Sequence, residues 1–185
     1  KNPKGYCPDH STGVKFTKKN IAEKDNTQLL IGKQIIVIES ENYCPYCEKF
    51  RLDVVSSYQG SIPINFRLAS ELNGLEISTE TWVTPTILFL ENGKELFVKQ
   101  GYMTPENFYR VLGAIKLGKS EAFKVAFNEG TDPRYCKQYK IFKNTPDGIF
   151  LDKLSGAPLF DTRHRFNSAT GWLSFTKAIS GSVIK

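Results

Sequence analysis

Residues 35–55 read IIVIESENYCPYCEKFRLDVV, and this stretch decides the fold. It opens with Ile35-Ile36-Val37-Ile38, an uninterrupted β-branched run that is typical of a central strand buried on both faces. Apolar residues then recur at helical spacing from Cys47 to Tyr58, and Gly60 ends the pattern. The stretch therefore predicts a strand followed by a helix, with two cysteines at the junction.

The chemistry of the chain is concentrated in Cys44-Pro45-Tyr46-Cys47. The first thiol lies at the start of the predicted helix, where unpaired backbone N–H groups and the helix dipole favour the thiolate. Cys47 lies one turn further, on the apolar side, and can resolve a mixed disulfide formed at Cys44. Two cysteines could also form half of a zinc site, but Cys7-Pro8-Asp9-His10 is a weak second half.

The same kind of pattern places further elements on both sides of this motif. Residues 64–68 follow Pro63 as a strand, and residues 86–90 and 95–98 form two strands around Asn92-Gly93, which suits a type I′ hairpin turn. Thr104-Pro105 opens a helix, because a capping hydroxyl precedes a proline at the first helical position. Residues 14–32 predict a leading helix that stops at glycine 32.

Composition limits the classes of protein that fit. The chain has 185 residues, of which 40% are hydrophobic and 24% charged, as in globular proteins. It has no apolar run long enough for a membrane span of about 20 residues. The net charge is +6, and residues 119–185 hold 11 Lys and Arg against 6 Asp and Glu. These charges are scattered among apolar residues, so we expect no nucleic-acid partner.

Residues 14–118 resemble the thioredoxin superfamily. The resemblance is carried by the strand at 35–39, the two cysteines, Val83-Thr84-Pro85-Thr86 and the segment 87–102. It implies a cis-proline at Pro85 that faces the cysteine pair, with Thr84 offering backbone groups to an extended partner peptide. Pro45 and Tyr46, between the cysteines, are expected to contact the partner, and the alternative for Tyr46 is packing alone.

Two departures from that superfamily bear on the mechanism. Cys-Pro-Tyr-Cys is the pattern of glutaredoxins, but the flank of Pro85 and the hairpin look like thioredoxins, so we infer no glutathione cofactor. Ile38 stands where thioredoxins carry a buried acid, and the neighbouring Glu39 is expected on the opposite face of the strand. The acceptor for the proton of Cys47 is therefore open.

Residues 119–185 resemble the B-type methionine sulfoxide reductases. The motifs are Asn-Glu-Gly-Thr-Asp-Pro-Arg-Tyr at 128–135, Gly-Ile-Phe-Leu-Asp at 148–152, Ser-Gly-Ala-Pro-Leu-Phe at 155–160 and Thr-Gly-Trp-Leu-Ser-Phe at 170–175. The resemblance assigns Trp172 to the apolar pocket for the substrate methyl group. The alternative is that Trp172 is a plain core residue. Leu173 replaces the usual proline, and Thr170 stands where some members hold a recycling cysteine.

The sequence differs from these reductases at the catalytic cysteine. The catalytic cysteine of that family comes well after these motifs, and no cysteine follows Cys136 in this sequence. We therefore expect no sulfoxide reduction by residues 1–185 alone, because that mechanism needs a thiolate nucleophile. Cys136 is expected to be unpaired or structural, with relay of electrons as the alternative. Cys7 is expected to lie in a mobile N-terminus, and a bridge between Cys7 and Cys136 is a further alternative.

The predicted fold is α/β: a thioredoxin-like three-layer α/β/α domain at 1–118, followed by a partial, β-rich reductase-like segment at 119–185. In that segment, strands at 149–152 and 159–161 would lack partners. Phe160, Trp172 and Phe175 are therefore expected to pack on residues 1–118 or across a homodimer.

The predicted function is thiol–disulfide exchange by Cys44 and Cys47, with no cofactor and no metal. The expected partner is a methionine sulfoxide reductase domain or another oxidised protein thiol or disulfide, and an external reductant restores the pair. A tether would present the dithiol to such a domain at roughly millimolar concentration. The alternatives are an extracytoplasmic disulfide oxidant or isomerase, and a metal-binding or adaptor module. An extracytoplasmic location is expected, with the cytoplasm as the alternative.

Overall fold

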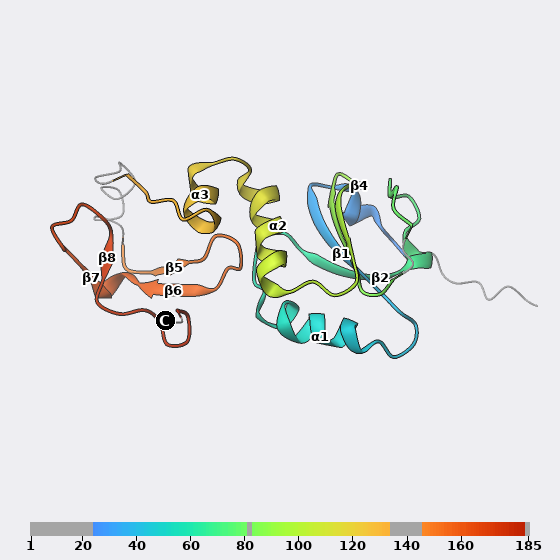
Figure 1. Ribbon diagram of the computed structural model, residues 1–185, viewed down its shortest axis with the longest axis horizontal. Helices are drawn as coiled ribbons and strands as arrows, with labels where there is room; N and C mark the ends of the chain where they lie inside the picture. Colours follow the sequence, from blue (N-terminus) through green and yellow to red (C-terminus); the bar gives the residue numbers. More distant parts are fainter. Residues whose placement is uncertain (1–23, 81–82, 134–145, 184–185) are drawn as a thin grey trace, which may run out of the picture.

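A four-stranded mixed sheet forms the centre of the first domain (Figure 1). The computed structural model describes residues 24–80, 83–133 and 146–183. The strands are β1 (Lys33–Glu39), β2 (Ile64–Leu68), β3 (Thr86–Glu91) and β4 (Lys94–Gln100), in the spatial order β2-β1-β3-β4. β1 pairs parallel with β2 and antiparallel with β3, which pairs antiparallel with β4. The strand pattern predicted from the sequence is confirmed.

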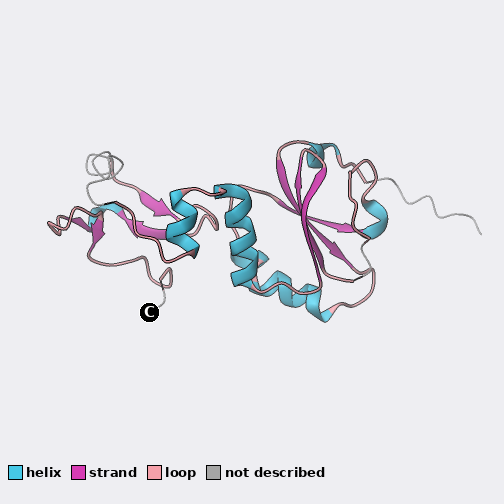
Figure 2. Cartoon of the chain, turned by 45° about the horizontal axis from the view of Figure 1, so that its top comes forward, coloured by secondary structure: helices cyan, strands magenta, loops and turns pink. Residues whose placement is uncertain are grey.

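Two helices pack together on one face of this sheet. They are α1 (Pro45–Asp53) and α2 (Pro105–Leu117), and Figure 2 shows both on the same side of the magenta strands. Their buried residues Phe50 and Phe108 join Val37 and Phe89 of the sheet in one apolar cluster. Thr104 caps α2 as expected, because its side chain accepts a hydrogen bond from the N–H of Asn107.

The other face of the sheet is covered without an α-helix among the described residues. Leu29, from the 3₁₀ turn η1 (Thr27–Leu30), packs against Ile36 and Ile38 of β1, together with apolar side chains from residues 72–77. The leading helix predicted at 14–32 is therefore wrong over residues 24–32, while its earlier part lies outside the described residues. Asp25 explains the difference, because its carboxylate accepts hydrogen bonds from the N–H and hydroxyl of Thr27.

The hairpin turn between β3 and β4 follows the sequence prediction. Asn92 and Gly93 have φ values of 52° and 78°, the left-handed conformation that both central positions of a type I′ turn require. The Asn92 side chain also accepts a hydrogen bond from the N–H of Gly32. This contact joins the start of β1 to the turn, so the hairpin holds the central strand in register.

The second part of the chain contains one helix and two small sheets among its described residues. α3 (Glu121–Phe127) is followed by β5 (Ile149–Leu151), β6 (Pro158–Asp161), β7 (Arg165–Phe166) and β8 (Ser174–Phe175). Short 3₁₀ turns lie at Val55–Ser57 (η2), Ala69–Glu71 (η3) and Thr162–His164 (η4). β5 pairs antiparallel with β6, and β7 with β8, so the expectation that β5 and β6 lack partners is wrong.

Three phenylalanine rings of this part, from β5, β6 and β8, pack on one another. The rings of Phe160 and Phe175 stack with centroids 4.6 Å apart, and Phe150 lies edge-on to Phe175 at 5.4 Å. The indole N–H of Trp172 donates to the carbonyl of Asp132. The contact with residues 1–118 is made instead by Leu154 and Phe127, which the sequence analysis did not single out.

Phe108 is the residue on which the packing of the first domain most depends. Its ring is fully buried and lies within 6 Å of the rings of Phe50, Tyr58, Phe89 and Tyr109. We expect Phe108→Ala to lower the free energy of unfolding by about 3–5 kcal/mol in guanidinium titrations, because it leaves a cavity. Leu96→Ala, on the exposed side of β4, should change it by less than about 0.5 kcal/mol. Equal effects would contradict this description of the core.

Candidate active site

The two cysteines of the Cys-Pro-Tyr-Cys motif lie at the start of α1, as the sequence predicts. Cys44 is the N-cap residue and has an extended backbone, while Cys47 lies in the first turn. The two sulfur atoms form a disulfide, so the structure shows the oxidised state. Cys47 is 4% exposed, whereas Cys44 is partly exposed. Cys44 is therefore the sulfur that a partner can reach.

The N-terminal end of α1 places a backbone N–H group beside the sulfur of Cys44. The backbone N–H of Cys47 points at this sulfur, with an N–S distance of 3.2 Å. Proline follows at the first helical position, where its missing N–H costs no hydrogen bond. Free N–H groups and the helix dipole stabilise negative charge at this place. In the reduced protein they favour the thiolate of Cys44 over its thiol.

The peptide bond between Thr84 and Pro85 is cis, as the resemblance to thioredoxins implies. The hydroxyl oxygen of Thr84 is 3.6 Å from the sulfur of Cys44. β3 begins directly afterwards at Thr86, whose buried hydroxyl donates to the carbonyl of Val83. The start of β3 and the start of α1 thus meet at one edge of the sheet, and they bring together residues 40 positions apart.

A surface hollow of about 340 Å³ opens beside the two cysteines. Its lining includes both sulfur-bearing residues, Glu39 at the end of β1, and Tyr43 and Arg51. Tyr43 and Tyr46 are 77% and 61% exposed, and they flank Cys44 in the sequence. The sequence analysis overlooked Tyr43, although an aromatic residue beside a reactive cysteine is a signal that could have found it.

Glu39 lies on the same side of the sheet as α1. Along β1, Ile35 and Val37 belong to the cluster under α1, whereas Ile36 and Ile38 face the other side. Glu39 continues the first series, because side chains alternate along a strand. Glu39 and Ile38 therefore lie on opposite faces of the strand, as expected. The face of Glu39 is the one that carries the cysteines. Ile38, which stands where thioredoxins carry a buried acid, faces away from the cysteines in this chain.

Arg51 holds Glu39 in place. Its guanidinium donates two hydrogen bonds to the carboxylate, with N–O distances of 2.6 and 2.5 Å, and it lies 3.7 Å from the ring centroid of Phe66. The hydrogen bonds with Glu39 raise the pKa of Arg51, so its guanidinium stays charged. One carboxylate is therefore fixed at the edge of the hollow that also contains Cys47.

Trp172 is not brought to this site. It lies in the second part of the chain, between β7 and β8, and Figure 1 shows these strands at the end of the molecule remote from the first turn of α1. Cys7 and Cys136 lie outside the described residues. Among the described residues, no group of three or more His, Cys, Asp or Glu is placed to hold a metal ion. No helix in the described ranges is long and apolar enough to cross a membrane.

Comparisons with known proteins match two different families to two parts of the chain. Residues 26–116 match the family of thioredoxin-like domains, and residues 119–185 match the SelR domain, the B-type methionine sulfoxide reductase family. One solved structure that resembles the chain is the periplasmic thioredoxin SoxS from Paracoccus pantotrophus in its reduced form. It is 17% identical, with a TM-score of 0.40, and the match covers 48% of this chain and 99% of that one.

The fold and the cysteine pair support a thiol oxidoreductase. More specifically, the chain consists of a thioredoxin-like domain followed by a SelR domain, as the resemblances in the sequence imply. The thioredoxin-like domain carries Cys44 and Cys47 together with the cis-proline.

The contact between Thr84 and Cys44 can be tested by removing one hydroxyl. In the reduced protein this hydroxyl can donate to the thiolate, and such a bond contributes about 1 kcal/mol. We expect Thr84→Val to slow alkylation of Cys44 by iodoacetamide at neutral pH about fivefold, since less thiolate is present. The midpoint of the alkylation profile should move to higher pH. Thr84→Ser keeps the hydroxyl and should react like the unmodified chain; a slow Ser variant would contradict the assignment.

Proposed function

We propose that this protein catalyses thiol–disulfide exchange and reduces a partner protein through Cys44 and Cys47. The observation that carries the proposal is the position of Cys44 at the N-terminus of α1, partly exposed and bonded to a buried second sulfur. Thr84 borders this sulfur, and the backbone of this residue, which precedes β3, offers an extended partner chain a place to bind.

The reaction has two steps, and each exchanges one sulfur–sulfur bond for another. The thiolate of Cys44 attacks one sulfur of the partner's disulfide, forms a mixed disulfide and releases the other partner sulfur, which takes up a proton. The thiolate of Cys47 then attacks the sulfur of Cys44 and releases the second partner thiol. Two electrons pass to the partner, and the Cys44–Cys47 disulfide remains until an external dithiol reduces it.

Glu39 is the proposed acceptor for the proton of Cys47. A buried thiol must lose its proton before it can attack, and burial disfavours the thiolate. The carboxylate of Glu39 borders the same hollow as Cys47, and its bidentate bond to Arg51 fixes its position. A water molecule in the hollow can carry the proton between the two groups. Arg51 acts as a positioning residue.

The proposed partner is a SelR domain. After each turnover such a reductase holds an oxidised cysteine that a dithiol must reduce, and the chain itself contains a SelR match at 119–185. The fusion fits this pairing, because tethered domains meet at high local concentration. An extracytoplasmic location also stays a prediction, for which fractionation of the producing cells is the direct measurement.

Single-cysteine variants test the order of the two steps. We expect Cys47→Ser to accumulate a stable mixed disulfide with an oxidised protein substrate, because the resolving thiol is missing. Cys44→Ser should form none, since the remaining thiol is buried. Both variants should lose the reduction of insulin disulfides that the unmodified chain shows with dithiothreitol. If both variants reduced insulin at the original rate, the proposed function would be refuted.

Replacing the carboxylate of Glu39 tests its role. We expect Glu39→Gln to slow release of the reduced partner at neutral pH by about tenfold or more. A general base accelerates a reaction by about a hundredfold or more, and the loss is smaller where another group can accept the proton. The deficit should shrink as the pH rises, because hydroxide can then take the proton of Cys47 without help from Glu39.

The matched control is Glu48→Gln, since Glu48 borders the same hollow from α1. It should leave the rate and its pH profile unchanged. A pH-independent loss in Glu39→Gln, or an equal loss in both variants, would show that Glu39 does not accept the proton.

A further inference from the structure

A turn of the SelR domain packs into the core of the thioredoxin-like domain. It connects β5 to β6, next to α2 in Figure 1, and we call its residues 152–156 the docking turn. Leu154 of this turn is 6% exposed and belongs to the apolar cluster under α1 and α2. Tyr58 and Ile62, which follow α1, belong to the same cluster. The docking turn thus supplies a core residue to the neighbouring domain.

Hydrogen bonds from the thioredoxin-like domain end on the backbone of the docking turn. The N–H of Gln59 donates to the carbonyl of Ser155 at 2.7 Å, and the Lys116 ammonium donates to the carbonyl of Lys153 at 2.6 Å. We call residues 58–62, together with Lys116, the docking surface. Because the donors reach carbonyl groups, they recognise the conformation of the turn rather than its polar side chains.

Two glycines allow the two backbones to approach closely. A Cβ atom at Gly60 would lie 2.3 Å from the carbonyl oxygen of Leu154, and one at Gly156 would lie 2.3 Å from the carbonyl oxygen of Gln59. Gly156 also has a φ of +75°, which favours glycine. A side chain at either position would force the docking turn away from the docking surface.

The docking turn is held in shape by its own hydrogen bonds. The carboxylate of Asp152 accepts from the N–H groups of Leu154 and Ser155, at 3.1 and 2.6 Å, and from the hydroxyl of Ser155 at 2.7 Å. The N–H of Gly156 donates to the carbonyl of Asp152. None of these bonds involves the docking surface. A preformed element loses little conformational entropy when it binds.

A second contact between the domains lies on α3. The ring of Phe127 packs against Gly113 of α2, where a Cβ atom would lie 2.2 Å from the ring. The guanidinium carbon of Arg110 lies 5.7 Å from the centroid of the same ring. This contact and the docking turn both belong to residues beyond the connection between α2 and α3.

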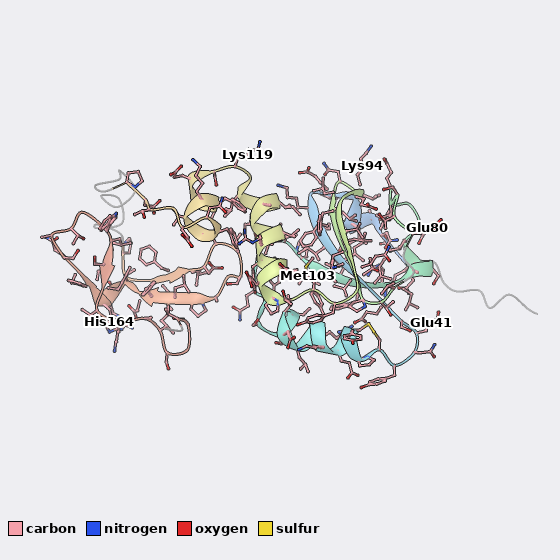
Figure 3. The ribbon with its side chains drawn as sticks, in the orientation of Figure 1. Glu41, Glu80, Lys94, Met103, Lys119 and His164 are labelled. Atoms are coloured by element: carbon pink, nitrogen blue, oxygen red, sulfur yellow. A yellow bond between two sulfur atoms is a disulfide. The ribbon has the colours of Figure 1, made fainter. Side chains whose placement is uncertain are left out.

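The connection itself lies outside these contacts. A Cβ atom at Gly118 would meet nothing within 4 Å, and Lys119 is exposed. Figure 3 labels Lys119 at this place, on the outside of the molecule. The surfaces that join the two domains are therefore separate from the segment that links them covalently.

We propose that the docking surface is a binding site for the docking turn that works without the covalent connection, so that a SelR domain on a separate chain can occupy it. The ligand is a preformed turn that presents one leucine, two backbone carbonyls and a glycine in the left-handed conformation. This inference goes beyond the proposed function, because neither sulfur of the cysteine pair takes part in it.

Cutting the connection tests the proposal on the folded full chain. A recognition sequence for a specific protease is inserted between Gly118 and Lys119, and the purified protein is cleaved there. We expect the two pieces to remain one complex in gel filtration at about 10 µM, with a dissociation constant of about 1 µM or below in a dilution series. Separation of the pieces at about 10 µM would overturn the proposal.

Two substitutions in the docking turn measure its share of the binding. We expect Leu154→Ala to raise the dissociation constant of the cut complex at least about tenfold, because it removes the buried side chain. Leu151→Ala, at an exposed position on β5, is its control and should leave the constant unchanged. Gly156→Ala should also raise it at least about tenfold, since the added methyl separates the backbones. Its control is Gly148→Ala, where the new Cβ would meet nothing within 4 Å.

Circular dichroism before cleavage shows whether each variant is folded. An unchanged constant in Gly156→Ala, or equal changes in the variants and their controls, would show that the docking turn is not the ligand. If Leu154→Ala did not fold, Gly156→Ala and its control would decide alone, because that change lies outside the apolar cluster. The readout is the association of two pieces, so its outcome is independent of the insulin assay.

Discussion

The burial of β1 on both of its faces is the constraint on which the active site depends. Ile35, Ile36, Val37 and Ile38 have no exposed surface, so each face of the strand must be covered. α1 and α2 cover one face, and this places the first turn of α1 over the end of β1. The alternation of side chains then decides that Glu39, and not Ile38, lies on the side of Cys47. One packing requirement thus positions both the nucleophile and the carboxylate.

Local signals explain why much of the first domain could be predicted. The β-branched run of β1, the Asn92-Gly93 turn and the Thr104 cap each act through residues adjacent in the sequence, and the structure contains all three. Cys44 and Cys47 are likewise recognisable by their spacing at a strand-to-helix junction. The cis form of Pro85 was implied only by a resemblance, and no local rule brings Thr84 to Cys44, 40 positions away.

The features that escaped prediction depend on distant contacts. Leu154 lies in a polar turn, and its burial follows only from the approach of Gly60, 94 positions earlier in the sequence. Phe160 and Phe175 were expected to pack on the first domain or across a homodimer, but β5 and β6 pair with each other and the two rings stack. The apolar character of these side chains favours their burial, but it does not determine which part of the protein covers them.

One buried leucine connects the two parts of the chain. Leu154 is 6% exposed and belongs to the apolar cluster under α1 and α2, and the N–H of Gln59 donates to the carbonyl of the neighbouring Ser155. Burial of one leucine side chain contributes about 1.5–3 kcal/mol, which corresponds to a factor of about 10 to 100 in favour of the packed arrangement. The core of the first domain is therefore completed by a residue that lies outside the match to the thioredoxin-like family.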